Sequence, residues 1–433
     1  MMKSEIIYHK NYIIFEDNCW NNFLPFTFTR FTGDIRAGVL KLRQRLGIYF
    51  DFEPKKIVIR EDLSELYKKR HDDWEINNFP KGEYIFINSR LKVNEQIKNE
   101  IINLKFGQKL VFENDILAFS LKFDQDFSCS TENINGLHVS LEKVVSNSSG
   151  MYSQKNNDII NSSSPLWNFT WEFLLENGNL IKDDFQQIFY EEDNFMEIDP
   201  GVIALNPYDI WIGENTIIKH GVLLDASEGP VIIDENVTIL HNTVIIGPVY
   251  IGKNSLIKIG AKIYGNTSIG PFCKVGGEVS GCIFQAYSNK QHDGYLGQSF
   301  IGEWVNIGAD TNNSDLKNTY KPVKVWFYPQ KKKISTDCLF IGVFIGDHSK
   351  IGINCSINTG AMIGFGVNLY GSDMISDFIP SFSWGEAKNL ALYQIDKFLE
   401  TASTVKKRRN EDLKIEEINL INKIYIENNE VLR

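Results

Sequence analysis

The chain has 433 residues, of which 43% are hydrophobic and 23% are charged, and its formal net charge is −10. This length is enough for two or three domains with ordinary hydrophobic cores. Neutralising the phosphates of nucleic acid needs a basic face, so the acidic balance argues against a nucleic-acid partner.

The amino terminus and the cysteines indicate the cellular setting. No long apolar run is present and the first residues lack a signal-peptide pattern, so we expect a cytoplasmic protein without membrane insertion. The six cysteines show no CxxC spacing. We therefore expect buried free thiols and predict no metal site.

The amino-terminal portion predicts an α/β layer. Short apolar runs at 12–15, 56–59 and 84–87 alternate with helical stretches, a pattern typical of a parallel sheet. The Ser/Asn-rich stretch 146–164 is expected to be a surface loop. Apolar residues at helical spacing in 166–185 predict a helix that closes this domain against the structure that follows, with its two tryptophans in the core rather than on a ligand platform.

A six-residue period begins near Ile212 and becomes strict from Ile233 onward. The aliphatic positions are Ile233, Ile239, Ile245, Ile251, Ile257, Ile263, Ile269 and Val275. This period predicts a parallel β-helix in which each aliphatic side chain points into a prism. The pattern returns around 296–308 and again over 341–369. Insertions that interrupt such a ladder lie on its outside, where sites are built.

The period changes to about 3.6 residues after Pro380, which predicts helices over 386–400 and 413–425. These helices are expected to cap the open end of the coil stack. The expected domains are 1–195, 196–378 and 379–433.

Strict periodicity fails at Gly281, and His292 lies in the polar break that follows. A lone histidine in an aliphatic ladder needs a partner to be core, so we expect His292 at a coil edge that faces a groove. The alternative is a surface histidine that caps a turn. Imidazole suits removal of a proton from a nucleophile near neutral pH.

The segment from His292 through Tyr295-Leu296-Gly297 to Asn306-Ile307-Gly308-Ala309 and Thr311 is similar to the acetyltransferase half of the bifunctional bacterial enzyme that makes UDP-N-acetylglucosamine. That half carries H-x-x-Y-L-G followed by N-I-G-A-G-T. The runs SNK-HDG-LG, GEWVN-GA-TNNSDLKN and PSFSWG resemble the shortened GlmU-like sugar-phosphate nucleotidyltransferases of Bacteroidetes, across almost the whole chain. The resemblance implies an α/β nucleotidyltransferase-like (Rossmann-like) domain, a left-handed parallel β-helix and C-terminal helices.

The resemblance also implies residue roles. His292 becomes the general base that deprotonates a sugar amine for attack on acetyl-CoA. The implied substrate-binding residues are Tyr295, Asn306 and Lys290, and those of the acetyl-CoA groove are Ala309, Thr311, Asn312 and Asn313, with backbone amides for the oxyanion. Two positions depart from the pattern, because Asp310 replaces a glycine and Asp315 lies where an Asn-Tyr pair is expected. The loop lysines from Lys317 to Lys333 are expected either to reach cofactor phosphates or to be solvated.

The amino-terminal half lacks the Gly-rich GGxGTR loop of true pyrophosphorylases. Thr32 stands at the place of their catalytic lysine, and Arg90 at the place of a magnesium-binding aspartate, so Mg²⁺ use is doubtful. Arg30, Arg36 and Arg90 are expected either to clamp a phosphate or sugar phosphate, or to form domain-interface ion pairs.

Three functions remain open from the sequence. The first is a transferase of amino-sugar or nucleotide-sugar metabolism that acetylates an amino-sugar phosphate from acetyl-CoA. The second is nucleotidyl transfer to a hexose 1-phosphate, and the third is a non-catalytic nucleotide-sugar-binding or scaffold protein. The resemblance implies a homotrimer with the acyl-donor groove between neighbouring β-helices, and loop 310–337 is expected to lie on a neighbouring prism.

Overall fold

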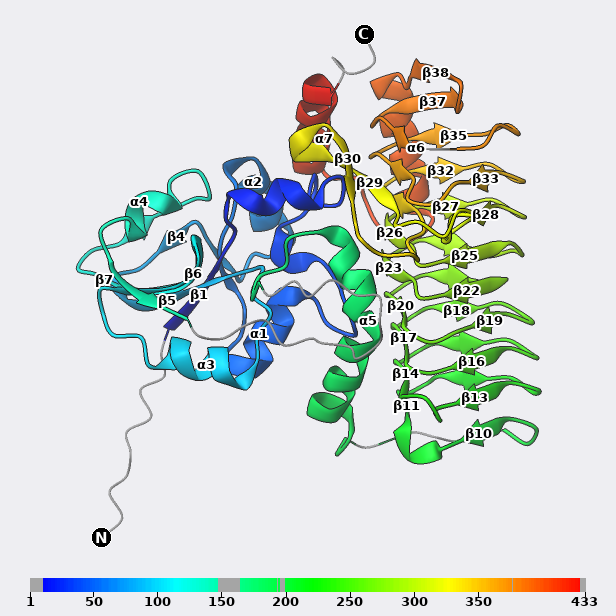
Figure 1. The fold of residues 1–433 in the computed structure, drawn as a ribbon, viewed down its shortest axis with the longest axis horizontal. Coiled ribbons are helices and arrows are strands. Elements are labelled where there is room, and N and C mark those ends of the chain that lie inside the picture. The colour runs from blue at the N-terminus through cyan, green and yellow to red at the C-terminus, as the bar shows by residue number, and fades with distance from the viewer. Residues whose placement is uncertain (1–10, 147–163, 193, 195–198, 376, 429–433) are drawn as a thin grey trace.

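The structure is a computed structural model that describes residues 11–146, 164–192, 194, 199–375 and 377–428. An α/β domain lies beside a long stack of β-coils (Figure 1). No helix in these ranges is both long and apolar enough to cross a membrane. Most of the Ser/Asn-rich stretch predicted to be a loop falls outside the described residues.

The α/β domain is built on a seven-stranded sheet. In spatial order its strands are β3 (Glu75–Ile76), β2 (Lys56–Val58), β1 (Asn11–Phe15), β5 (Gly82–Asn88), β7 (Asp115–Phe123), β6 (Gln108–Phe112) and β9 (Glu142–Val145). The helices are α1 (Leu42–Phe50), α2 (Glu61–Arg70), α3 (Glu95–Ile102), α4 (Ile134–His138) and α5 (Thr170–Asp184), and β4 (Asn78–Phe79) pairs with β8 (Phe127–Ser128).

The three predicted strand runs form β1, β2 and β5, and they are parallel as expected. The prediction of a parallel sheet is wrong for the strand β7, while β6 and β9 are again parallel to each other. β7 runs antiparallel to β5 and to β6, so the sheet is mixed. The cause is a tight β6–β7 reversal, in which Glu113 adopts the left-handed conformation with φ 53°.

The β-helix has three faces. The six-stranded face holds β10 (Ile203–Leu205), β13 (Leu223–Asp225), β16 (Val244–Ile246), β19 (Lys262–Ile263), β22 (Glu278–Ser280) and β25 (Tyr295–Gly297). The nine-stranded face holds β11 (Ile210–Ile212), β14 (Val231–Ile233), β17 (Val249–Ile251), β20 (Thr267–Ile269), β23 (Ile283–Ala286), β26 (Phe300–Glu303), β31 (Phe344–Ile345), β34 (Met362–Ile363) and β36 (Phe378–Ile379).

The ten-stranded face holds β12 (Ile217–Ile218), β15 (Thr238–Ile239), β18 (Leu256–Ile257), β21 (Lys274–Val275), β24 (Asn289–Lys290), β27 (Asn306–Ile307), β32 (Lys350–Ile351), β35 (Asn368–Leu369), β37 (Ser383–Glu386) and β38 (Asn389–Leu392). β28 (Asn312–Asn313) pairs with β33 (Ser356–Ile357) and lies beside β25.

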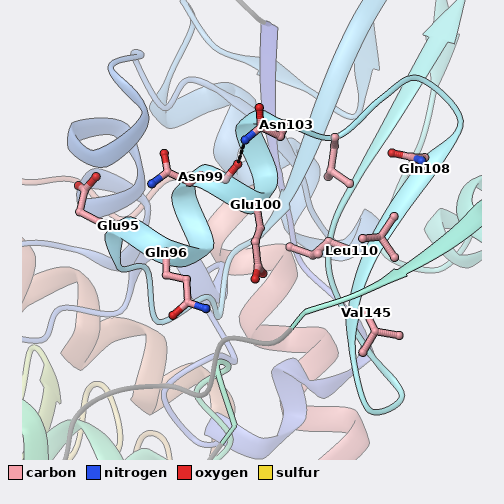
Figure 2. Close-up of a pocket in the computed structure, with 10 residues that line it drawn as sticks. Glu95, Gln96, Asn99, Glu100, Asn103, Gln108, Leu110 and Val145 are labelled. Carbon is pink, nitrogen blue, oxygen red and sulfur yellow. Dashed lines mark hydrogen bonds between the residues drawn. The ribbon is translucent and has the colours of Figure 1, made fainter.

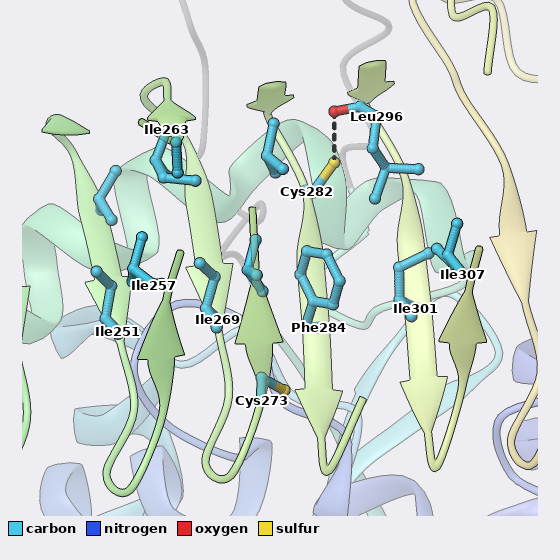
Figure 3. Close-up of a cluster of buried hydrophobic side chains, with 14 of the residues drawn as sticks. Ile251, Ile257, Ile263, Ile269, Cys273, Cys282, Phe284, Leu296, Ile301 and Ile307 are labelled. Atoms are coloured by element: carbon cyan, nitrogen blue, oxygen red, sulfur yellow. Dashed lines mark hydrogen bonds between the residues drawn. The ribbon is translucent and has the colours of Figure 1, made fainter. Parts of the chain in front are cut away.

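The predicted aliphatic ladder is the interior of this prism. Ile233 pairs in register with Ile251, which pairs with Ile269, so a full coil takes eighteen residues and three strands. All eight predicted ladder positions are buried, and Figure 3 shows the side chains of Ile251, Ile257, Ile263 and Ile269 between the faces. The predicted α/β layer and β-helix are therefore confirmed.

The insertion after β28 packs against other parts of the same chain. It forms a hairpin of β29 (Lys324–Phe327) and β30 (Lys332–Ser335), and its Val323 and Val325 join a buried cluster with Phe26 and Trp171 of the α/β domain. The expectation that this loop needs a neighbouring prism is therefore wrong, because Val323 and Val325 are covered between the two domains of one chain.

Two expectations about the carboxyl end need correction. The β-helix continues past residue 378, since β36 and β37 pair with β34 and β35. Residues 386–392 form part of a hairpin, and the helices are α6 (Ile395–Lys407) and α7 (Ile415–Asn428). They do not cap the coil stack. Phe398 and Leu420 share a core with the α/β domain, and hairpin residue Leu390 packs against the last coil.

Helix α5 lies along the nine-stranded face and joins the two domains (Figure 1). Trp167 and Trp171 are buried, as expected of core residues. Asn177 on α5 accepts a hydrogen bond from Gly38 and donates one to the carbonyl of Asn266, so a single side chain links the α/β domain to the prism.

Candidate functional site

His292 lies at the corner where the chain leaves β24 of the ten-stranded face for β25 of the six-stranded face. The residue two positions past the inward residue of each such strand occupies the same place in its coil. This corner column consists of His220, His241, Ile259, Gly277, His292, Ala309, Ile353 and Gly371. The His292 side chain is exposed, and among the described residues no hydrogen bond or ion pair of its ring is present.

Ala309 is the next residue of the corner column. The two coils are joined just beside it, because the Asp310 N–H donates to the Asp293 carbonyl at 2.9 Å. Neighbouring strands are about 4.8 Å apart, so the His292 and Ala309 backbones are about that close. Among the described residues no acceptor lies within hydrogen-bond distance of the Ala309 N–H. The same is true of the N–H groups of Ile259 and Ile353 in the same column. A base and an open amide donor thus share one corner.

Tyr295 lies three residues beyond His292 and is half-buried. Its hydroxyl donates to Asp315 Oδ2 at 2.8 Å, and its N–H donates to Asn312 Oδ1 at 2.7 Å. Burial and the Asp315 carboxylate raise the pKa of the Tyr295 phenol, which therefore stays protonated. Asp315, a departure from the expected pattern, orients the tyrosine.

Two residues expected in the cofactor groove have structural roles. Thr311 is buried, and its hydroxyl donates to the Gly352 carbonyl at 2.7 Å. Asn313 bonds both the N–H and the carbonyl of Gly297. Their polar groups tie adjacent coils together. The prediction is therefore wrong for these two side chains, while Asn312 remains exposed.

Lys290 also corrects the sequence prediction. It occupies the ladder position between Val275 and Ile307, so its side chain points into the prism and is 1% exposed. Its ammonium donates to the carbonyls of Gly276 and His292 at 3.1 and 2.9 Å. Burial lowers the Lys290 pKa to about 8. A buried ammonium cannot bind substrate at the surface, but it fixes the backbone of His292.

Asn306 points outward from the ten-stranded face. Its side-chain oxygen accepts from Asn289 Nδ2 at 3.5 Å, and Asn289 in turn accepts from Arg409 at 2.8 Å. Arg409 comes from the end of α6. No local sequence pattern predicts this contact, because it joins residues 120 positions apart.

The three arginines of the α/β domain are all buried. Arg90 binds both oxygens of Asp17, at 2.6 Å for the closest pair, and also donates to Trp167 and Asn168. Burial alone would raise the Asp17 pKa, but Arg90 brings it below its ordinary value. An internal ion pair thus fills the place that the resemblance gives to a metal ligand.

Arg30 and Arg36 lie at the domain interface. Arg30 pairs with Asp347 of the β-helix at 2.7 Å, and Arg36 shares two backbone hydrogen bonds with the Gln285 side chain. The Arg36 guanidinium contacts the Val39 carbonyl. For all three arginines, phosphate clamping is therefore wrong. Arg30 forms a domain-interface ion pair, which was the alternative expectation for these arginines.

A hollow of about 710 Å³ in the α/β domain lies beside α3 and the β6–β9 edge (Figure 2). Two carboxylates, Glu95 and Glu100, and four side-chain amides line it together with apolar residues. It has no cation for a phosphate. Among the described residues no group of three His, Cys, Asp or Glu side chains is placed to hold a metal ion.

The sequence profile of the sugar nucleotidyl transferase family matches residues 12–192. The bifunctional protein GlmU of Wigglesworthia glossinidia brevipalpis is 32% identical over 188 residues, which cover 40% of this chain and 38% of that protein. A bifunctional sugar-1-phosphate nucleotidylyltransferase/acetyltransferase of Sulfurisphaera tokodaii is 36% identical over 149 residues, which cover 33% and 36%. The chain spans under two fifths of the length of these relatives.

Among solved structures, the UDP-N-acetylglucosamine acyltransferase LpxA of Bacteroides fragilis is 17% identical, with a TM-score of 0.27, and the match covers 51% of this chain and 80% of that one. A likeness this distant defines neither fold nor function here. The profile match and the relatives show what the chain is similar to by sequence: residues 12–192 are similar to sugar nucleotidyl transferases, and parts of the chain are similar to GlmU proteins.

Proposed function

We propose that the β-helix transfers an acyl group, acetyl from acetyl-CoA, to the amine of an amino-sugar phosphate. The observation that carries this proposal is the exposed His292 ring one coil away from the open N–H of Ala309. The name of the Sulfurisphaera tokodaii relative, which includes an acetyltransferase, supports the reaction class.

In this reaction the sugar amine attacks the thioester carbonyl carbon, so that a C–N bond forms and the C–S bond breaks. His292 takes the proton that the nitrogen loses, and the departing thiolate receives a proton in return. The Ala309 N–H is placed to donate to the oxygen that carries negative charge in the tetrahedral intermediate. Tyr295, held by Asp315, offers a protonated hydroxyl near the same corner.

The test is acetyl transfer by His292→Ala with acetyl-CoA and glucosamine 1-phosphate. We expect a loss of roughly 10²–10⁴ in turnover with an unchanged melting temperature, because the exposed ring supplies proton transfer and not packing. His241→Ala is the matched control, since His241 is an exposed histidine at the same corner of another coil. A loss below about fivefold in His292→Ala, or an equal loss in the control, would remove His292 from the mechanism.

Nucleotidyl transfer is the second candidate, and the profile match over 12–192 favours it. The Arg90–Asp17 ion pair counts against the ordinary magnesium-dependent form, because a cation stands where a metal ligand is needed. Release of pyrophosphate from a nucleoside triphosphate and a sugar 1-phosphate by the pure protein would identify this second function.

We also propose a homotrimer with the corner column facing a neighbouring copy. The six-stranded face supports this proposal, because Ile203, Leu205 and Tyr264 on its strands are exposed by 57%, 43% and 38%. Apolar groups on the outside of a sheet favour a covered surface. Light scattering at micromolar concentration should give about three times 49.6 kDa. A particle of one chain's mass would contradict a shared site.

A further inference from the structure

Four cations gather on the outer surface of the ten-stranded face near Asn289, which is one strand away from Asn306. Lys274 and Asn289 are register partners on β21 and β24. Arg409, at the end of α6, donates to Asn289 Oδ1 at 2.8 Å, so its guanidinium lies beside Lys274. Lys258 follows β18, whose Leu256 pairs with Lys274. Arg408 is the neighbour of Arg409.

These cations are not neutralised. Within the described part of the chain, Lys258, Lys274 and Arg408 make no ion pair and no side-chain hydrogen bond. Elsewhere on the same prism, lysines pair with carboxylates, as Lys253 does with Glu235 and Lys262 with Glu278, both at 3.7 Å. The chain as a whole carries a net charge of −10, so four neighbouring cations without an ion-pair partner run against its overall charge balance.

The lowered pKa of Lys274 supports the conclusion that these four cations lie close together. Burial lowers the pKa of Lys274, and Arg409, Arg408 and Lys258 lower it further because they repel its charged form. The carboxylate nearest to Arg409 in sequence, Glu411, is exposed and accepts a hydrogen bond from Tyr287 at 3.4 Å. Like charges held together without a counter-charge favour a bound anion.

We propose that Lys258, Lys274, Arg408 and Arg409 bind the phosphate or diphosphate group of a small-molecule ligand. Residue 289, beside which the group lies, precedes His292 by three positions, or about 10 Å of extended chain. A ligand anchored here that extends about 10 Å beyond its phosphate therefore reaches the corner column. That connection rests on the proposed acyl transfer, but anion binding does not.

Calorimetric titration with inorganic pyrophosphate tests the site. We expect the Lys274→Gln/Arg408→Gln double variant to bind roughly tenfold or more weakly than the unmodified chain, since it removes two of the four cations that would hold the anion. Arg409 is left intact because it holds Asn289. The control is Lys253→Gln/Lys262→Gln, which removes the same charge from paired lysines of the same prism.

Equal affinity in the unmodified chain and the test variant, equal weakening in both double variants, or absence of binding at millimolar pyrophosphate would each overturn the proposal. Melting temperatures confirm that both variants fold. The His292→Ala variant should bind pyrophosphate normally. If the unmodified chain binds the anion but shows no acyl transfer, the proposed reaction is contradicted and the proposed anion site is not. Further titrations with coenzyme A and with glucosamine 1-phosphate show which phosphate source loses affinity in the test variant.

Discussion

Arg90 has three kinds of partner, and the most important is the Asp17 carboxylate. The side chain is fully buried and bonds Asp17, a backbone carbonyl and an amide oxygen. A buried guanidinium is stabilised only while its hydrogen bonds are satisfied. This residue therefore fixes the end of β5 and the segment after β1, where a nucleotide site would otherwise open.

We expect Arg90→Met to lower the free energy of unfolding by roughly 3–5 kcal/mol, because the variant leaves Asp17 without its cation. Chemical denaturation at neutral pH measures the change. Lys69→Met, at an exposed position on α2, is the control and should change little. Removing both charges with Asp17→Asn/Arg90→Met should recover most of the loss. If the double variant is as unstable as the single one, the ion pair is not the cause.

Residue-level prediction from the sequence depends on how local the pattern is. The spacing from His292 to Tyr295, Asn306 and Ala309 placed these residues near one corner, because each coil repeats the same path. It failed for Lys290, because polarity alone does not show that an ammonium can turn inward and bond backbone carbonyls. It also left the arginines undecided, since their partners lie up to 317 residues away.

At the scale of elements, α7 is held to the rest of the molecule by a buried carboxylate. Glu417 lies 2.6 Å from Lys406 of α6, and 3.7 Å from Arg70 of α2. His348 of the β-helix faces it at 3.8 Å, but burial lowers the His348 pKa, so the imidazole is neutral at pH 7. One side chain thus joins three elements that come from distant parts of the sequence.

Glu417 predicts a specific acid sensitivity. Burial alone would raise its pKa, but His348, Arg70 and Lys406 bring the pKa to about 2. Because the folded pKa is lower than the unfolded one, the carboxylate stabilises the fold above about pH 4.5, and this contribution disappears as the pH falls toward 2. A displacement of this size corresponds to about 3 kcal/mol.

We therefore expect the stability difference between the unmodified chain and Glu417→Gln to be large at pH 6 and to shrink between pH 4.5 and 2. Urea denaturation across this range measures it. Glu427→Gln, on an exposed turn of the same helix, should give a difference that is small at every pH. A gap for Glu417→Gln that does not depend on pH would contradict the assigned pKa.

Prediction of the elements followed the strength of their periodicity. The six-residue ladder predicts the β-helix, since most inward positions are aliphatic or small and stack on one another, with Lys290 as an exception. The carboxyl end was less clear, because the hairpin β37–β38 alternates over only a few residues before α6 begins. The docking of α6 and α7 beside α2 depends on tertiary contacts that no local period encodes.

At the scale of the whole molecule, the two domains share a hydrophobic core and a buried ion pair. Phe26 contacts Phe300 with ring centroids 4.5 Å apart, and Phe23 and Trp171 belong to the same cluster. Arg30 and Thr29 both bond the Asp347 carboxylate across the boundary. Separating the domains would expose these rings and leave both charges without partners.

We therefore expect the chain to unfold in a single cooperative transition, with no stage in which only one domain is folded. Far-ultraviolet circular dichroism follows all the backbone, and hydrogen exchange read out by mass spectrometry follows α/β and β-helix peptides separately. Asp347→Ala should speed global exchange in both sets together, because the side chain it removes is a partner of both. Asp373→Ala, which removes a surface pair with Lys388, is the control. Two separate melting steps, or faster exchange confined to one domain, would show that the shared interface does not couple them.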